Sequence, residues 1–211
     1  SDYTIREYIC NFIMSTLEVN TINPQSGNDV TIGGSSKNVK FASGTTVDFN
    51  TNTPTLTLGA AMKATPAFEA RGSAEQTGVS DNTWTKVSMN TEIFDTDSMY
   101  DASTNYRFTP TTAGKYYVYA MMSLYGGTSD QLQIANLGIY KNGSNYKYLS
   151  NNFNNSYPHN EAALFLSTVV DMNGSSDYVE LYGRANVLSG NVTFEPQNTL
   201  GLFGAYRIIG A

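Results

Sequence analysis

Charged side chains are scarce in this chain of 211 residues, of which only 14% are Asp, Glu, Lys or Arg, with 18 acidic against 12 basic residues. Phosphate binding needs concentrated positive charge, so this composition argues against nucleic acid as the main partner. A hydrophobic content of 40% and an aromatic content of 12% argue against disorder. No apolar run approaches the ~20 residues of a membrane-spanning helix, and membrane insertion is not expected.

Cysteine and histidine each occur once, as Cys10 and His159. A single cysteine can form neither an intrachain disulfide nor a CxxC-type zinc site, and a single histidine allows at most one Ser-His-Asp arrangement. No nucleophile and carboxylate pattern surrounds His159, so we expect no catalysis and no cofactor. The first residues also lack a basic stretch followed by an apolar run, and a secretory signal is not expected.

Residues 1–27 are interpreted as an N-terminal attachment segment. Ile5, Ile9, Phe12 and Ile13 have helical spacing, which predicts a short amphipathic helix or an anchoring arm. Met14 resembles an internal start, which leaves open whether residues 1–13 are native.

Residues 28–66 contain a weak repeat of short apolar-polar-apolar units that begin at Val30, Val39, Val47 and Leu56. Each unit can form one strand and a turn with both apolar side chains on one face. Such a unit cannot bury that face alone, so we expect several chains to intertwine into a β-stalk that ends in a neck near Pro66. The alternative is a plain meander packed against the next domain.

From residue 67 onward the pattern is all-β, with short alternating or aromatic runs between turn signals. The clearest runs are 85–89, 116–122, 137–140, 163–166, 178–182 and 202–206. Asn142-Gly143 predicts a hairpin turn, because both residues accept positive φ angles, and Asn173-Gly174 is a second candidate. Many short strands without a helical period predict a sandwich or jelly roll.

Residues 67–210 resemble the C1q/TNF-like domain. The matching segments are Pro66–Ala70, Trp84–Val87, Asn90–Asp95, Phe108 to Val118 with Gly114 and Tyr116, Tyr140–Gly143, Asp177–Leu181 and Leu202–Ile208. Val118 and Ala120 stand where the family usually has aromatic residues. The resemblance implies a ten-stranded jelly roll over residues 67–211 that assembles as a compact homotrimer.

Residues 17–27 and the repeats behind them resemble the start of structural proteins of marine tailed phages. Together the two resemblances imply a trimeric virion surface protein, a phage fibre or a capsid decoration. Its N-terminal segment would bind a capsid or tail protein, and its head would adhere to a host or environmental glycan or stabilise the capsid. The alternatives are a bacterial cell-surface C1q-like adhesin or glycan-binding module, a glycan-cleaving tailspike and a secreted soluble lectin.

The run 116–122 predicts a strand with one face in the core and the other on a second surface. Alternation places Tyr117 and Tyr119 on the face opposite to Tyr116. In the C1q-like family a central aromatic surface packs between subunits, which implies that Tyr117 and Tyr119, with Phe203 or Tyr206, lie at the trimer axis. The alternative is that one subunit buries both faces.

Two further groups are candidate sites. Residues 146–148 and the loop 151–160 are rich in aromatic and amide side chains, which resemble the chemistry of an antibody paratope and of neutral glycan recognition. The candidate ligand residues are Tyr146, Tyr148, Asn152, Phe153, Asn155 and Tyr157. The alternative is an ordinary long connection. Asp95, Asp97 and Asp101 form a weak calcium candidate, which lacks the order of an EF-hand loop and is more simply explained by turn carboxylates.

Overall fold

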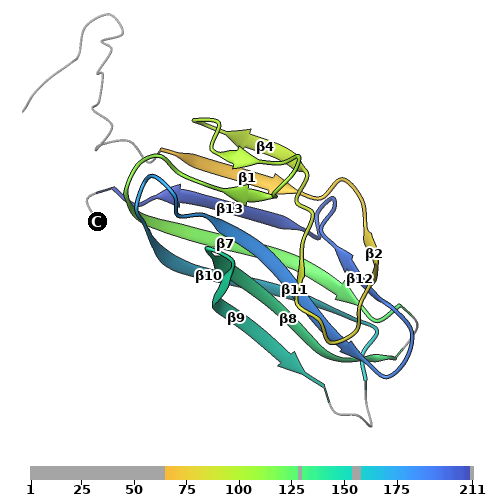
Figure 1. Cartoon of the computed structure of the whole chain (residues 1–211). Coiled ribbons are helices and arrows are strands. Elements are labelled where there is room, and N and C mark those ends of the chain that lie inside the picture. Colours follow the sequence, from red (N-terminus) through yellow and green to blue (C-terminus); the bar gives the residue numbers. More distant parts are fainter. Residues whose placement is uncertain (1–64, 128–129, 154–157, 210–211) are drawn as a thin grey trace, which may run out of the picture. The chain divides into compact units, whose positions relative to one another are not determined.

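The computed structural model describes residues 65–127, 130–153 and 158–209, and it folds them into two antiparallel β-sheets (Figure 1). These residues form strands without any helix, so a membrane-spanning helix is also absent from them. The strands are β1 (Ala67–Arg71), β2 (Gln76–Val79), β3 (Thr85–Lys86), β4 (Thr91–Asp95), β5 (Tyr100–Asp101), β6 (Arg107–Phe108), β7 (Gly114–Tyr125), β8 (Leu132–Lys141), β9 (Ser144–Asn152), β10 (Glu161–Met172), β11 (Val179–Val187), β12 (Val192–Glu195) and β13 (Leu202–Arg207). The attachment segment and the repeats up to residue 64 lie outside the described residues, so the β-stalk stays a prediction.

The seven-stranded sheet is organised around β7. Along one side β7 pairs with β10 over its full length, and along the other side it pairs with β13 and then with β12 (Figure 1). Strands β1 and β4 extend the sheet beyond β13, and β2 extends it beyond β12. Strands distant in sequence therefore meet at β7.

The six-stranded sheet has the order β5-β6-β11-β8-β9, with β3 also paired to β11. Strands β8 and β9 form a hairpin closed by Asn142 and Gly143, whose φ angles are 52° and 75°. This confirms the predicted turn. A turn is also present at the second candidate, because Asn173 Oδ1 accepts the N–H groups of Ser175, Ser176 and Asp177 while Gly174 has a φ of 71°. It is not a hairpin, since it links β10 of one sheet to β11 of the other.

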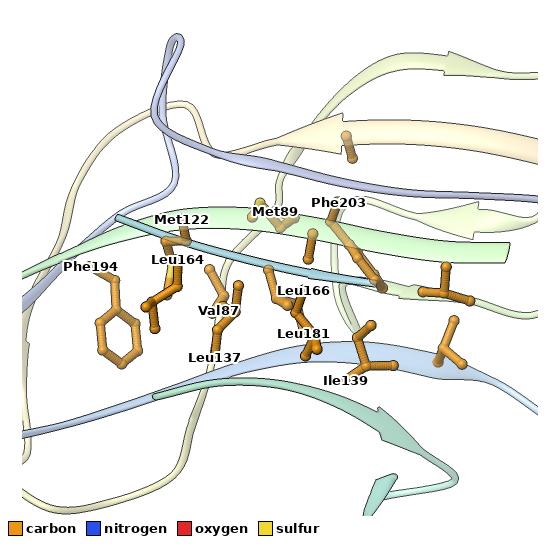
Figure 2. Packing of buried hydrophobic residues seen from close by; sticks show 14 of the residues in the cluster. Val87, Met89, Met122, Leu137, Ile139, Leu164, Leu166, Leu181, Phe194 and Phe203 are labelled. Carbon is orange, nitrogen blue, oxygen red and sulfur yellow. The ribbon is translucent and has the colours of Figure 1, made fainter. Parts of the chain in front are cut away.

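The core lies between the two sheets and contains side chains from both (Figure 2). Met122, Leu164 and Phe194 belong to the seven-stranded sheet, and Leu137 and Leu181 belong to the six-stranded sheet. At another point of the core, Phe68 stacks on Tyr100 and Phe108 with ring centroids 4.5 and 4.6 Å apart. Burial of these apolar side chains is the main force that holds the sheets together.

The two-sheet, all-β prediction is confirmed, but the described residues form thirteen strands rather than the expected ten. The difference arises between β1 and β7, where positive φ angles at Asn82, Ser98 and Tyr106 fall between successive short strands. The run expected as a strand over 85–89 forms a strand only at Thr85–Lys86, and the Val87 N–H donates one further hydrogen bond to the Leu181 carbonyl of β11.

Candidate functional site

The outer face of the seven-stranded sheet carries a continuous group of apolar and tyrosine side chains. Even-numbered residues of β7 from Tyr116 to Met122 are buried in the core, so Tyr117, Tyr119 and Met121 point outward. On β10 the strand register places Val169 opposite Tyr117 and Phe165 opposite Met121. On β13 it places Tyr206 opposite Tyr117 and Leu202 opposite Met121. We call this set, together with Phe94 of β4, the tyrosine face: Phe94, Tyr117, Tyr119, Met121, Phe165, Val169, Leu202 and Tyr206.

Several side chains of the tyrosine face are exposed to an unusual degree for apolar residues. Phe165 is 54% exposed, Phe94 45%, and Val169 and Tyr206 are each 43% exposed. Contiguous apolar surface of this kind is uncommon on monomeric proteins and usually marks an interaction site.

The tyrosines hold one another in place. The ring of Tyr117 lies 5.5 Å from that of Tyr206 and 6.0 Å from that of Tyr119. The Tyr119 hydroxyl donates a hydrogen bond of 2.9 Å to Glu69 Oε2, and burial together with this bond raises the pKa of Tyr119. A Cβ at Gly204 would lie 2.5 Å from the Tyr119 ring, so the ring can cover β13 only because residue 204 is glycine.

Ionic groups lie at the ends of this surface, and Glu69 lies within it, between Gly204 and Phe94 in the strand register. Lys115 and Asp171, which are register partners at one end of β7 and β10, form a salt bridge of 2.7 Å. Glu161 lies at the other end and accepts a hydrogen bond from Ser123. The centre therefore combines apolar surface with phenol hydroxyls, which suits association with another apolar surface.

The structure brings together three of the four residues predicted at a subunit interface. Tyr117, Tyr119 and Tyr206 lie side by side on the outer face. The prediction for Phe203 is corrected, because this side chain is fully buried in the core, where its ring meets that of Phe68 edge-on at 5.1 Å. Alternation along β13 points Phe203 inward and Tyr206 outward, since the two are three residues apart.

Sequence reasoning missed the contributions of β10 and β4 to this surface. Phe165, Ser167 and Val169 alternate with buried Leu164, Leu166 and Val170, and that alternation was the available signal. Phe94 lies within Asn90–Asp95, one of the segments that resemble the C1q/TNF-like domain, but only the pairing of β4 with β1 shows that it faces outward beside Glu69.

The predicted ligand segment is divided between a strand and a loop. Tyr146 and Tyr148 belong to β9, where they are 46% and 55% exposed, and Asn152 is the last residue of that strand. Phe153 packs against the core and stacks on the His159 ring at 4.2 Å, which indicates a structural role. Asn155 and Tyr157 lie outside the described residues.

The three candidate calcium ligands each accept local hydrogen bonds. Asp95 accepts the N–H of Tyr100 at 2.7 Å, and Asp97 accepts the hydroxyl of Thr96. Asp101 accepts the N–H groups of three following residues, which hold the pKa of its carboxyl well below its usual range. In the described part of the chain, these carboxylates do not form a metal-binding group of three or more ligands.

No protein-family model and no curated protein sequence matches the chain. Similar solved structures include murine APRIL, at 10% identity and a TM-score of 0.49 over 67% of this chain and 98% of that chain. Another is the Eiger TNF of S. frugiperda, at 10% identity and a TM-score of 0.48 over 69% of this chain and 93% of that chain. The description of this chain as a two-sheet sandwich rests on its own strand pairing.

Proposed function

We propose that the chain is a homotrimeric structural protein of a virion, a phage fibre or a capsid decoration. Its jelly-roll head would face outward for adhesion to host or environmental glycans or for stabilisation of the capsid. The tyrosine face is the single structural observation behind this proposal, and it supports the part that concerns self-association, because it is the surface on which copies of the chain would meet.

Physical chemistry favours self-association through the tyrosine face. Burying an exposed apolar side chain contributes about 1.5–3 kcal/mol when the burial is complete, so several half-exposed residues on one face make a substantial contribution. Protein interfaces are enriched in Tyr, Phe and Met, which are the residue types of most of this face. Glu69 is the acidic exception, and its carboxylate accepts the hydrogen bond of the Tyr119 hydroxyl. The choice of a trimer over other symmetric assemblies rests on the resemblance of residues 67–210 to the C1q/TNF-like domain.

The assignment to a virion rests on the resemblance of residues 17–27 and the following repeats to phage structural proteins. Cryo-electron microscopy of particles from the source tests it. Threefold density at capsid lattice positions indicates a decoration, and density at the tail indicates a fibre. Absence from every particle overturns the virion assignment and favours the bacterial cell-surface adhesin.

Sedimentation equilibrium of the full chain tests the trimer. The chain has a mass of 23.0 kDa, so three copies give about 69 kDa. Phe165→Arg places a charge in the tyrosine face and should shift the mass toward that of one chain, since an unpaired charge is costly at a buried contact. Leu188→Arg is the matched control, because Leu188 is similarly exposed, at 51%, but lies outside the tyrosine face. A wild-type protein that sediments as a monomer, or equal effects of the two variants, would refute the proposal.

A further inference from the structure

The outer face of the six-stranded sheet contains a hollow of about 420 Å³. It is lined by Trp84, Ile134, Asn136, Asn145, Tyr148, Ser150 and Arg184. These residues come from β8, β9, β11 and the segment that leads into β3. The volume falls in the range of small-ligand sites.

The strand register explains why these side chains meet. Asn136 of β8 lies directly between Ser150 of β9 and Arg184 of β11. One step along the sheet, Gly138 separates Tyr148 from the next outward residue of β11. A Cβ at Gly138 would lie 3.0 Å from Trp84 Cζ3, so this glycine provides the space in which the Trp84 ring lies.

Aromatic rings form one wall of the hollow. Trp84 meets Tyr148 edge-on, with centroids 5.8 Å apart and an interplanar angle of 77°. Trp84 also lies 5.8 Å from Tyr140, which stacks on Tyr182 at 3.9 Å. The exposed Tyr148 thus stands beside a Trp84 ring that further aromatic contacts hold in place.

Arg184 supplies the single charge among the lining residues. Its guanidinium carbon lies 5.9 Å from the Trp84 ring centre, and within the described residues its Nε is buried without a hydrogen-bond partner. The salt bridges among the described residues are all made by Lys86, Lys115 and Lys141, so Arg184 has no carboxylate partner there. A guanidinium without a carboxylate partner can pair with an anionic group of a ligand, even though the chain as a whole has a net charge of −6.

The remaining polar groups are neutral. Asn136 is only 3% exposed and lies opposite Ser150 in the strand register, and Asn145 also lines the hollow. Amide and hydroxyl groups both donate and accept hydrogen bonds, which matches the hydroxyl groups around a sugar ring. The C–H face of a pyranose ring in turn packs well on Trp and Tyr.

We propose that this hollow binds an acidic saccharide, a pyranose ring that carries a negatively charged substituent. The ring packs on Trp84 and Tyr148, its hydroxyls bond to Asn136 and Ser150, and its anionic group pairs with Arg184. The inference rests on the proposed adhesive function, whose ligand class it names. It does not depend on where in a particle the protein lies, and the hollow shares no residue with the tyrosine face.

Isothermal titration calorimetry of the full chain tests the ligand class. The probes are an oligogalacturonate, a sulfated galactan oligomer and a neutral galactan oligomer of the same length. We expect the wild type to bind at least one acidic probe, more weakly as salt rises, and to bind the neutral probe at least about tenfold more weakly.

Arg184→Gln should lower the affinity for the acidic probe about tenfold or more, because it removes a charge-assisted contact. Tyr148→Ala removes an exposed part of the aromatic wall and should also weaken binding. Arg107→Gln is the matched control, since Arg107 lies 4.5 Å over the Tyr178 ring on the same sheet but does not line the hollow, and it should leave the affinity unchanged.

Every result of these titrations either supports or overturns the inference. Dependence on Arg184 for the uronate, the sulfated probe or both supports the inference and identifies the anion. Failure of both acidic probes to bind, equal binding of the neutral probe, or equal effects of the Arg184 and Arg107 variants overturns it. Sedimentation of the same samples separates the two proposals: a trimer without saccharide binding refutes only this inference, and a monomer that binds the acidic probe refutes only the trimer.

Discussion

Replacing Lys86 by methionine should destabilise the domain strongly, because Lys86 neutralises a buried carboxylate. Lys86 Nζ lies 2.5 Å from Glu180 Oε1 and also donates a hydrogen bond of 3.2 Å to the carbonyl oxygen of Asn105. The Glu180 side chain is 4% exposed and that of Lys86 is 32% exposed. The carboxylate is therefore the partner that water cannot reach.

The magnitude follows from this asymmetry. Breaking a buried ion pair by removing one partner costs about 3–5 kcal/mol, and the partial exposure of Lys86 places the cost of Lys86→Met at about 3 kcal/mol. Glu180→Gln leaves a Lys86 ammonium that water can solvate, so it should cost about 1 kcal/mol. For a domain of this size, about 3 kcal/mol corresponds to a decrease of about 6–12 °C in Tm.

Urea unfolding of Lys86→Met, Glu180→Gln and the double variant Lys86→Met/Glu180→Met at one protein concentration checks the reasoning. The double variant should recover much of the loss, because it replaces the pair by apolar side chains of similar volume. If Lys86→Met destabilises no more than Glu180→Gln, the buried carboxylate does not need its partner and the reasoning is refuted.

Three further predictions concern pH and packing. Burial and the nearby charge of Glu161 raise the pKa of Glu195, so ionised Glu195 destabilises the fold above its unfolded-state pKa. Glu195→Gln should therefore raise Tm at pH 7 and have little effect on Tm at pH 3. The pKa of Asp101 is lowered in the folded state, so its carboxylate stabilises the fold above the unfolded-state pKa of about 3.9 and loses that effect as the pH falls toward the folded-state pKa. Asp101→Asn should therefore lower Tm at pH 7, and the difference in Tm from wild type should shrink below pH 4. A difference that does not change with pH would contradict this prediction. A Cβ at Gly183 would lie 2.8 Å from Phe194 Cζ in the core, so Gly183→Ala should cost about 1–3 kcal/mol in urea unfolding, whereas an unaltered midpoint would show that the core adapts.

The alternation of β7 was readable from the sequence because each side chain points to the face opposite to its neighbour's. The same rule left β13 ambiguous, since Leu202, Phe203, Ala205 and Tyr206 supply apolar groups to both faces. Only the pairing of β13 with β7 and β1 decides that Phe203 is buried and Tyr206 exposed.

The hollow could not be predicted, because its residues become neighbours only through pairings between distant strands. Asn136 and Arg184 meet across β8 and β11, which are not consecutive in the chain. Tyr148 was recognised by its residue type, but nothing local to the sequence places the Trp84 ring on Gly138. Turn chemistry was more accessible, because Asn142-Gly143 carries its conformational preference within two residues.

Strand β7 separates two kinds of contact by the parity of its residue numbers. From Tyr116 to Met122 the even positions contact the core, and the odd positions form the centre of the tyrosine face. Substitutions at Tyr117, Tyr119 and Met121 can therefore accumulate without disturbing the packing between the sheets. An engineer could therefore randomise these three positions to vary the chemistry of the outer surface while the side chains between the sheets stay unchanged.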